Sequence, residues 1–284
     1  MILTAHGELP LTASALERLA GLSDTGELAG EAEAAQVLLV GPRTPLPADA
    51  LASYPQLRHV AVCGTSVGRL DLDALRERGI SWSVAVDYGD DPAAEVMFHH
   101  LVAVMRGIGP VRWRPTSHEV AGKRLVVVGL GALGIAVARL ALGFGMDVAH
   151  ISRTPKPEWE ARGVARVDRS ALADADVVVL CGPTHVPVLD AADFARLGDA
   201  ILIQGSLGHV FDHASFADWV AGDQRVAIFD QSTGDDVLER VVGLPHVVVS
   251  PISAGLSQEA MERLGDQVVA NVERVMAGGG PGRA

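Results

Sequence analysis

The sequence predicts an α/β protein built on parallel β-sheets, and three observations lead to this fold class. Short apolar runs alternate along the chain with longer segments of helical periodicity, a pattern that favours strand–helix–strand units. Most of these runs are continuous stretches of Val, Ile and Leu, as expected of parallel strands buried on both faces. The chain has 284 residues, of which 49% are apolar, so its length suggests about two domains with a sizeable core.

Strands and helices alternate in the first third of the chain. Helices are predicted over residues 12–22 and 71–78, and Gly79 suits the end of the second one. A longer helix is predicted to begin near Pro92, because acidic residues precede this proline and a proline is favoured in a first helical turn. The strands predicted in this part are residues 2–5, 36–40, 59–62 and 81–86.

A second α/β series follows the Gly-Ile-Gly-Pro break at residues 107–110. The last element predicted is a helix over residues 257–276. The strands predicted in this series are residues 124–128, 147–151, 177–180, 200–203, 226–229 and 247–249.

Charge and composition limit the classes of partner. A formal net charge of -12 argues against nucleic acid or an anionic membrane surface as the main partner. The cysteines, Cys63 and Cys181, lack metal-binding or redox spacing, so no metal site is expected and a reducing compartment fits. The start of the chain does not resemble a signal peptide, and no apolar run reaches the length of a membrane span. We therefore expect a cytoplasmic protein whose partner is a small molecule.

A glycine turn lies between a predicted strand and a predicted helix and reads Gly129-Leu-Gly131-Ala132-Leu133-Gly134. This context makes the pattern informative for a dinucleotide-binding Rossmann domain. Gly129 would permit the tight turn, Gly131 would let a pyrophosphate approach the backbone, and Gly134 would let the helix pack on the strand. The helix N-terminus would then hold the phosphates. The alternative is a glycine-rich turn that binds no ligand.

The next predicted strand ends at Ser152-Arg153-Thr154. Folds selective for NAD usually place an acid near this position, where it binds the ribose 2′-hydroxyl. A carboxylate would repel a 2′-phosphate, whereas a hydroxyl and a guanidinium would bind one. The sequence therefore predicts NADP(H) in preference to NAD(H), the alternative being that Arg153 is a solvated surface charge.

From about Leu57 to Gly278 the chain resembles the D-isomer-specific 2-hydroxyacid dehydrogenases, which include glyoxylate/hydroxypyruvate reductases. The segment 57–80 resembles the family's substrate-carboxylate loop and the helix that follows it. Ala94-Glu95 matches the start of a family helix, residues 119–123 match the approach to the cofactor strand, and residues 152–157 resemble NADP-using members.

The resemblance implies a Rossmann NAD(P)-binding domain, residues 94–256, inserted in a flavodoxin-like substrate domain, residues 1–93 plus 257–284. It also implies an active site in the cleft between them. A homodimer is possible, but the segment that contributes to the family's dimer contact, between Glu95 and Gly122, is shorter here.

The resemblance also shows where this chain departs from the family. Leu207 stands at the position of the arginine that clamps the substrate, and Ile252 stands at the position of the acid/base histidine. Asp235 is the candidate for the glutamate that orients this histidine. Reduction of a 2-keto acid needs a cation at the carboxylate and a proton donor at the new alkoxide. Since leucine and isoleucine supply neither, a simple 2-keto acid is not the expected substrate.

Matching positions supply further candidate contacts. Gly64, Thr65 and Ser66 stand where the family offers backbone N–H groups to the substrate carboxylate. Asp230 matches the aspartate that binds the nicotinamide carboxamide. Other cofactor contacts are expected from Gly182, Thr184, Gly205 and Ser253.

Three side chains are candidates to replace the missing catalytic groups. His209 lies close after Leu207 and could be a displaced proton donor, or a surface or capping residue. Ser253 could bond the substrate oxygen or contact the cofactor, and Tyr88 could face the substrate or pack. Of the weaker candidates, His99 and His100 are expected to be packed or solvated, His185 lies where the family's next strand passes the cofactor, and Cys181 is expected to be a small core residue.

Three functions remain open at this point. The first is an NADP(H)-dependent oxidoreductase that transfers hydride to a carbonyl or imine. The second is a binding protein, such as a sensor or partner subunit, that keeps the dinucleotide site without turnover. The third is a lyase or isomerase that retains the dinucleotide.

Overall fold

The computed structural model describes residues 1–28, 31–67 and 69–279, and the chain divides into two compact units. The first unit comprises Met1–Tyr88 and the segment from Ser257 onward, and the second comprises Gly89–Leu256. The sequence analysis placed the first boundary before Ala94, whereas the second unit begins at Gly89 and includes the whole of the long helix that follows. Every strand pairing is parallel, which confirms the predicted α/β class.

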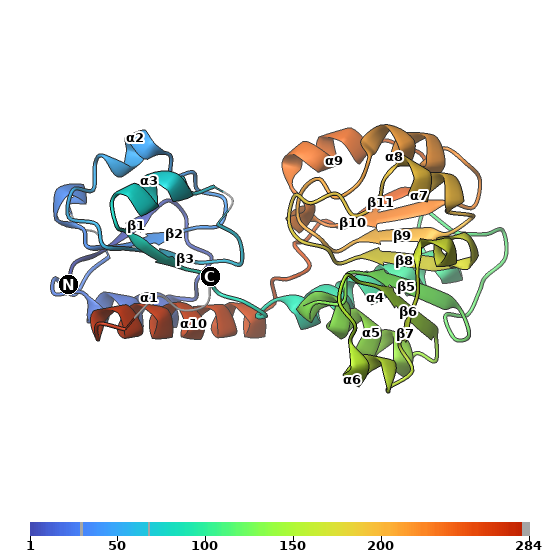
Figure 1. Cartoon of the computed structure of the whole chain (residues 1–284), viewed down its shortest axis with the longest axis horizontal. Coiled ribbons are helices and arrows are strands. Elements are labelled where there is room, and N and C mark those ends of the chain that lie inside the picture. Colours follow the sequence, from blue (N-terminus) through green and yellow to red (C-terminus); the bar gives the residue numbers. More distant parts are fainter. Residues whose placement is uncertain (29–30, 68, 280–284) are drawn as a thin grey trace. The chain divides into compact units, whose positions relative to one another are not determined.

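The first unit is a four-stranded sheet with helices on both faces (Figure 1). The strands are β1 (Leu3–His6), β2 (Val37–Val40), β3 (His59–Val62) and β4 (Ser81–Ser83), in the order β1-β2-β3-β4. The helices are α1 (Ala13–Leu22) and α10 (Gln258–Met276) on one face, and α2 (Ala48–Leu51) and α3 (Leu72–Glu77) on the other, with the short 3-10 helix Ala32–Ala34 before β2. Two apolar clusters, one on each face, fill the space between these layers.

The sheet of the first unit differs from a full flavodoxin-like sheet, in which the strand order is 2-1-3-4-5. In the described part of the chain the strands follow chain order with no reversal. At the edge beyond β1, the Ala5 N–H donates to the carbonyl of Leu28 at 2.9 Å. In a flavodoxin-like sheet the second strand would pair with β1 at this edge, and in the described residues this backbone hydrogen bond lies there instead.

The predicted strand 81–86 is too long, because α10 takes over its last backbone groups. The side chain of Gln267 bonds both the N–H and the carbonyl of Val86 at 2.9 Å, and the Asn271 amide donates to the carbonyl of Val84 at 3.1 Å. These groups are therefore satisfied by helix side chains instead of a strand ladder.

The second unit is a seven-stranded parallel sheet in the order β11-β10-β9-β8-β5-β6-β7. From β7 to β10 this is the doubly wound 3-2-1-4-5-6 order of a dinucleotide-binding domain, with β11 added at one edge. The order reverses between β5 and β8, and ligands of such sheets bind at that switch point, beyond the carboxyl ends of the strands. The strands are β5 (Arg124–Val128), β6 (Asp147–Ile151), β7 (Ala165–Arg166), β8 (Val177–Leu180), β9 (Ile201–Gln204), β10 (Val226–Phe229) and β11 (Val247–Val249).

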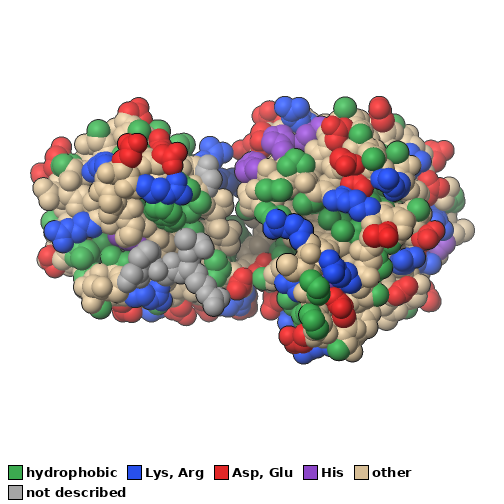
Figure 2. All heavy atoms as spheres, viewed as in Figure 1, with side chains coloured by type: hydrophobic (Ala, Val, Ile, Leu, Met, Phe, Trp, Pro, Cys, Tyr) green, Lys and Arg blue, Asp and Glu red, His purple; other side chains and the backbone are tan. Residues whose placement is uncertain are grey.

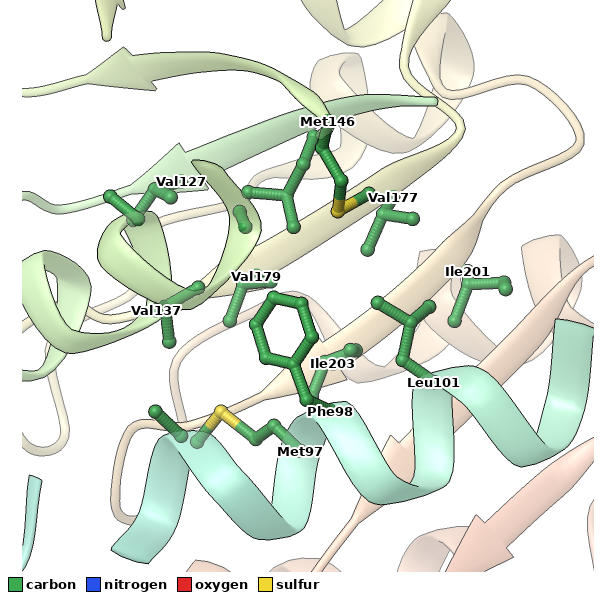
Figure 3. Packing of buried hydrophobic residues seen from close by; sticks show 14 of the residues in the cluster. Met97, Phe98, Leu101, Val127, Val137, Met146, Val177, Val179, Ile201 and Ile203 are labelled. Atoms are coloured by element: carbon green, nitrogen blue, oxygen red, sulfur yellow. The ribbon is translucent and has the colours of Figure 1, made fainter. Parts of the chain in front are cut away.

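Helices cover both faces of this larger sheet (Figure 1). Met97, Phe98 and Leu101 of α4 point toward strand residues such as Val179 and Ile203 (Figure 3). The helices on that face are α4 (Asp90–Arg106), α5 (Ala132–Gly143) and α6 (Pro157–Glu160). Those on the other face are α7 (Ala191–Arg196), α8 (His213–Val220) and α9 (Asp235–Val241), and 3-10 helices span Arg169–Asp174 and Gln231–Thr233.

None of the helices within residues 1–28, 31–67 and 69–279 combines the length and apolar character that a membrane crossing needs.

A candidate dinucleotide and reaction site

Crowding of the backbone explains two of the three glycines in the turn after β5. Gly129 has a φ of 100°, and a Cβ there would lie 2.4 Å from the carbonyl oxygen of Cys181, after β8. A Cβ on Gly134 would lie 2.1 Å from the carbonyl oxygen of Gly129. These glycines therefore allow the turn, the start of α5 and the end of β8 to meet at the switch point.

Gly131 differs from both, because the protein itself gives no steric reason for a glycine there. Its φ is -86°, and a Cβ would meet nothing within 4 Å. Gly131 is the N-cap of α5 and has no side-chain hydrogen bond to the helix, while Ala132 is exposed and Leu133 half-buried. Open space above uncapped N–H groups fits the pyrophosphate of a dinucleotide.

Internal packing accounts for the glycines at the ends of the neighbouring strands. A Cβ on Gly182 would lie 2.4 Å from Val188 Cγ1, and one on Gly205 would lie 2.6 Å from Met97 Cε. The Gly205 N–H also donates to the Leu180 carbonyl at 2.9 Å. Gly205 thus lets the end of β9 lie close to α4, and Gly182 lets the chain after β8 pack against Val188. Thr184 lies half-buried in the loop after β8.

The end of β6 presents cationic rather than acidic chemistry. The Ser152 hydroxyl donates to the Thr154 carbonyl at 2.7 Å and lies 3.0 Å from Nδ1 of the buried His150. Arg153 and Thr154 are exposed. The hydroxyl is thus engaged within the turn, and the guanidinium of Arg153 faces solvent.

Asp230 is buried at the end of β10. Its carboxylate accepts hydrogen bonds from the Ser232 hydroxyl at 2.6 and 2.7 Å and from the Ala254 N–H at 2.5 Å. Together with His100 and Gln204 it lines a small cavity. Ser253 is half-buried next to Ala254 but does not line this cavity. The Gln204 Oε1 atom is buried and has no hydrogen-bond partner among the residues that the structure describes.

Burial lowers the pKa of His100, the His99 imidazole lowers it further, and the negative charge of Asp230 opposes both. His100 therefore lies within electrostatic reach of Asp230, which the expectation of a merely packed or solvated histidine did not include.

Leu207 and Ile252, where the resemblance predicts that catalytic groups are missing, carry apolar side chains. Leu207 is half-buried, and its carbonyl accepts from the His185 N–H at 3.2 Å. Ile252 is 52% exposed. Neither side chain can bind a carboxylate or donate a proton.

His209, two residues after Leu207 in the sequence, forms the centre of a polar chain. Its Nε2 atom lies 2.7 Å from Asp236 Oδ2, and its Nδ1 atom lies 2.6 Å from Nε2 of His213, at the start of α8. Histidine side chains gather on the surface of the second unit near α9 (Figure 2). Asp235, the residue named from the sequence, is exposed, and it is Asp236 that contacts a histidine.

The charges and hydrogen bonds within the polar chain of Asp236, His209 and His213 favour the ionised form of Asp236. Burial alone would raise the pKa of Asp236, but the charge of His209 and its hydrogen bond outweigh burial and lower the pKa. Burial lowers the pKa of His213, whose Nδ1 is buried without a hydrogen-bond partner. Among the described residues, including Asp236, His209 and His213, no group of three or more His, Cys, Asp or Glu side chains is arranged to hold a metal ion.

The candidates in the first unit divide into loop and packing residues. Gly64 follows β3, and a Cβ there would lie 2.8 Å from Pro42 Cβ. Thr65 is exposed and Ser66 half-buried. Tyr88 packs against the apolar cluster beneath α10, and its carbonyl accepts from Arg263 Nη2 at 2.8 Å. Of the two roles considered for Tyr88, its contacts within this unit favour packing.

Cys181 has the character of a core residue. Its side chain packs against the apolar cluster between α4, α5 and the larger sheet, and burial raises the pKa of its thiol. A thiolate mechanism has no support at this position.

Comparison with known proteins gives a consistent family and fold. The family model described as D-isomer specific 2-hydroxyacid dehydrogenase, catalytic domain, matches residues 10–284. The chain is 29% identical over 282 residues to the (S)-sulfolactate dehydrogenase of Chromohalobacter salexigens, covering 90% of this chain and 89% of the relative.

Solved structures with the same fold include complexes of both nicotinamide cofactors. The D-lactate dehydrogenase of Aquifex aeolicus, complexed with NAD and lactic acid, matches with a TM-score of 0.77 at 18% identity, over 98% of this chain and 96% of that one. The acyclic imino acid reductase Bsp5, in complex with NADPH and D-Arg, matches with a TM-score of 0.79 at 20% identity, over 98% and 97%. At these identities the likeness concerns the fold.

Proposed function

Because the chain belongs to the D-isomer specific 2-hydroxyacid dehydrogenase family, we propose that it is an NADP(H)-dependent oxidoreductase that reduces a carbonyl or imine other than a simple 2-keto acid. The glycine turn carries this proposal: Gly131 leaves open space above the N-terminus of α5, where a pyrophosphate would bind. The exposed Arg153, with no acid at the ribose position, supports NADP(H) over NAD(H).

The proposed substrate class rests on Leu207 and Ile252. A 2-keto acid bound beside Leu207 would lack the cation that neutralises its carboxylate, and desolvating a charge without a counter-charge is costly. A larger and less charged carbonyl or imine compound would instead gain apolar contact from these side chains.

His209 is the proposed proton donor. When bound, NADPH supplies a hydride to the substrate carbon, and the proton for the carbonyl oxygen or imine nitrogen comes from the His209 imidazolium. Asp236, whose Oδ2 lies 2.7 Å from Nε2, fixes the orientation of the ring. His213 holds the Nδ1 atom, so both ring nitrogens have a partner, and donation to the substrate requires that one of them exchange its partner for the substrate atom.

The second candidate is a protein that binds the dinucleotide without turnover. The replacement of two catalytic positions by Leu207 and Ile252 favours it. In that case the polar chain through His209 would be structural.

The test combines cofactor binding with a substrate panel. Purified protein is titrated with NADPH and NADH, and NADPH consumption is followed with glyoxylate, hydroxypyruvate, aldehydes, ketones and cyclic imines. We expect tighter NADPH binding and turnover of a carbonyl or imine that is lost in His209→Ala and retained in His118→Ala, a histidine on another loop of the same unit.

Other outcomes decide against the proposal. Tight NADPH binding without turnover across the panel would support the binding-protein alternative. Rapid reduction of glyoxylate by the wild type would contradict the proposed substrate class, and equal or tighter NADH binding would contradict the proposed cofactor.

A further inference from the structure

Basic side chains from two strands meet where β6 ends. Arg153 and Lys156 follow β6, and Arg166 belongs to β7, where it is paired in register with His150 of β6. The Nη2 atom of Arg166 donates to the carbonyls of Ser152 and Arg153, both at 3.2 Å. Arg166 therefore anchors the turn from which the Arg153 side chain projects.

These cations lack the carboxylate partners that nearby arginines have. Arg162 Nη2 lies 2.9 Å from Glu158 Oε1, and Arg169 pairs with Asp193. In the part of the chain that the structure describes, no such ion pair involves Arg153, Lys156 or Arg166. Uncompensated cations at one place in a chain with a net charge of -12 point to an anion that binds there.

The electrostatics of His150 show that two of the cations act at the end of β6. Burial is the main cause that lowers the pKa of His150, and the charges of Arg166 and Lys156 lower it further, while Glu160 opposes them. Glu160 is the acid that faces His150, at 3.7 Å, and it also accepts from the Lys156 backbone N–H at 2.9 Å. The cationic field thus reaches the imidazole that contacts the Ser152 hydroxyl.

We propose that Arg166 determines cofactor specificity by binding, together with Arg153, the 2′-phosphate of NADP(H). This inference rests on the proposed function. The two hydrogens of Nη2 bond the turn carbonyls, which leaves the Nη1 and Nε donors of the guanidinium for a phosphate. The Ser152 hydroxyl donates to Thr154, so arginine donors must supply the phosphate contacts.

The test compares cofactors that differ only in the 2′-phosphate. Dissociation constants of NADPH and NADH, and of 2′,5′-ADP and 5′-AMP, are measured at one ionic strength for the wild type, Arg166→Gln and Arg153→Gln. We expect about tenfold weaker binding of NADPH and 2′,5′-ADP by Arg166→Gln, the scale of a charge-assisted hydrogen bond, with NADH and 5′-AMP unchanged. Arg162→Gln is the matched control, because Arg162 is also exposed but is paired with Glu158, and its constants should equal those of the wild type.

Two results would overturn the inference in distinguishable ways. If the wild type prefers NADPH and Arg166→Gln keeps the same ratio of NADPH to NADH affinity, Arg166 has no role in specificity, and the proposed function stands. An equal loss for both cofactors would assign Arg166 to holding the turn alone. If the wild type binds NADH as tightly as NADPH, the proposed cofactor preference fails and this inference fails with it.

Discussion

The glycine turn of Gly129, Gly131 and Gly134, here called the phosphate end, differs from the positions of Leu207 and Ile252, here called the reaction end because we propose that substrate binds there. Glycines stand at the phosphate end where the backbone is crowded or where space is open, whereas the reaction end carries apolar side chains. Gly129 and Gly134 each face a carbonyl oxygen within 2.4 Å of a would-be Cβ. Leu207 and Ile252 carry apolar side chains and supply no charge. Backbone crowding thus explains Gly129 and Gly134, whereas Leu207 and Ile252 bear on the proposed reaction.

This difference separates the question of cofactor binding from the question of which reaction is catalysed. Retention of the turn supports cofactor binding, because its geometry serves both packing and the phosphates. It says nothing of the reaction, which depends on the side chains that contact substrate. In our proposal, the polar chain of Asp236, His209 and His213 takes over the missing proton transfer.

The largest expected effect is at the phosphate end, in Gly134→Ala. The new Cβ would lie 2.1 Å from a backbone oxygen, which cannot move without displacing the turn from α5. We expect the free energy of unfolding to fall by about 4 kcal/mol and NADPH binding to be lost. Urea unfolding and a cofactor titration measure both, and a stable variant that binds NADPH normally would show that the turn tolerates a side chain.

The second prediction concerns how the free energy of unfolding depends on pH through His59, a residue of the first unit that is not part of the reaction end. His59 of β3 is buried between the hydroxyls of Ser81 and Ser83, at 2.8 and 2.9 Å, and burial lowers its pKa to about 4 from an ordinary 6.5. The unfolded chain then binds the proton more readily, so the stability that His59 confers is complete above pH 6.5 and is lost as the pH falls toward 4. This loss amounts to about 3 kcal/mol.

Urea unfolding between pH 7 and 4 measures that dependence. His59→Gln should flatten it, whereas His99→Gln, at an exposed position on α4, should leave it as in the wild type. An unchanged slope in His59→Gln would assign the acid sensitivity to other groups.

The third prediction tests the polar chain at the reaction end. If His209 donates the proton, His209→Asn should lower kcat by about 100-fold, within the range of general acid catalysis. Asp236→Asn should cost less, about tenfold, because it removes a stabilising charge and leaves the imidazole in place. NADPH affinity should not change in either variant, and a loss of affinity instead of kcat would move His209 from proton transfer to cofactor binding.

Much of the fold follows from the sequence because the buried strands are uninterrupted apolar runs. The predicted bounds of β5, β6, β8, β10 and β11 are confirmed, and β9 is displaced by one residue, to Ile201–Gln204. β7 was not predicted, because its two residues, Ala165 and Arg166, are both exposed and form no apolar pattern. The omission matters, since β7 carries Arg166.

The candidate site was predictable where a motif fixes backbone geometry and less so where a turn sets the register. The glycine pattern identified the turn after β5, and the structure assigns its glycines to different causes. Asp236 was missed in favour of Asp235, because a 3-10 turn and Gly234, with a φ of 108°, come between Asp230 and α9. No periodicity in the sequence determines which carboxylate such a turn directs toward His209.

The smallest expected effect gives the sharpest comparison, because Gly131→Ala changes the same turn as Gly134→Ala without the steric conflict. A Cβ at position 131 would meet no protein atom within 4 Å, and φ is ordinary, so unfolding should change by less than about 1 kcal/mol. A methyl group in the space proposed for the pyrophosphate should weaken NADPH and NADH alike, by about tenfold. Normal binding of both cofactors by a stable Gly131→Ala would remove the pyrophosphate from this position, and an unstable variant would mean that the space serves the fold after all.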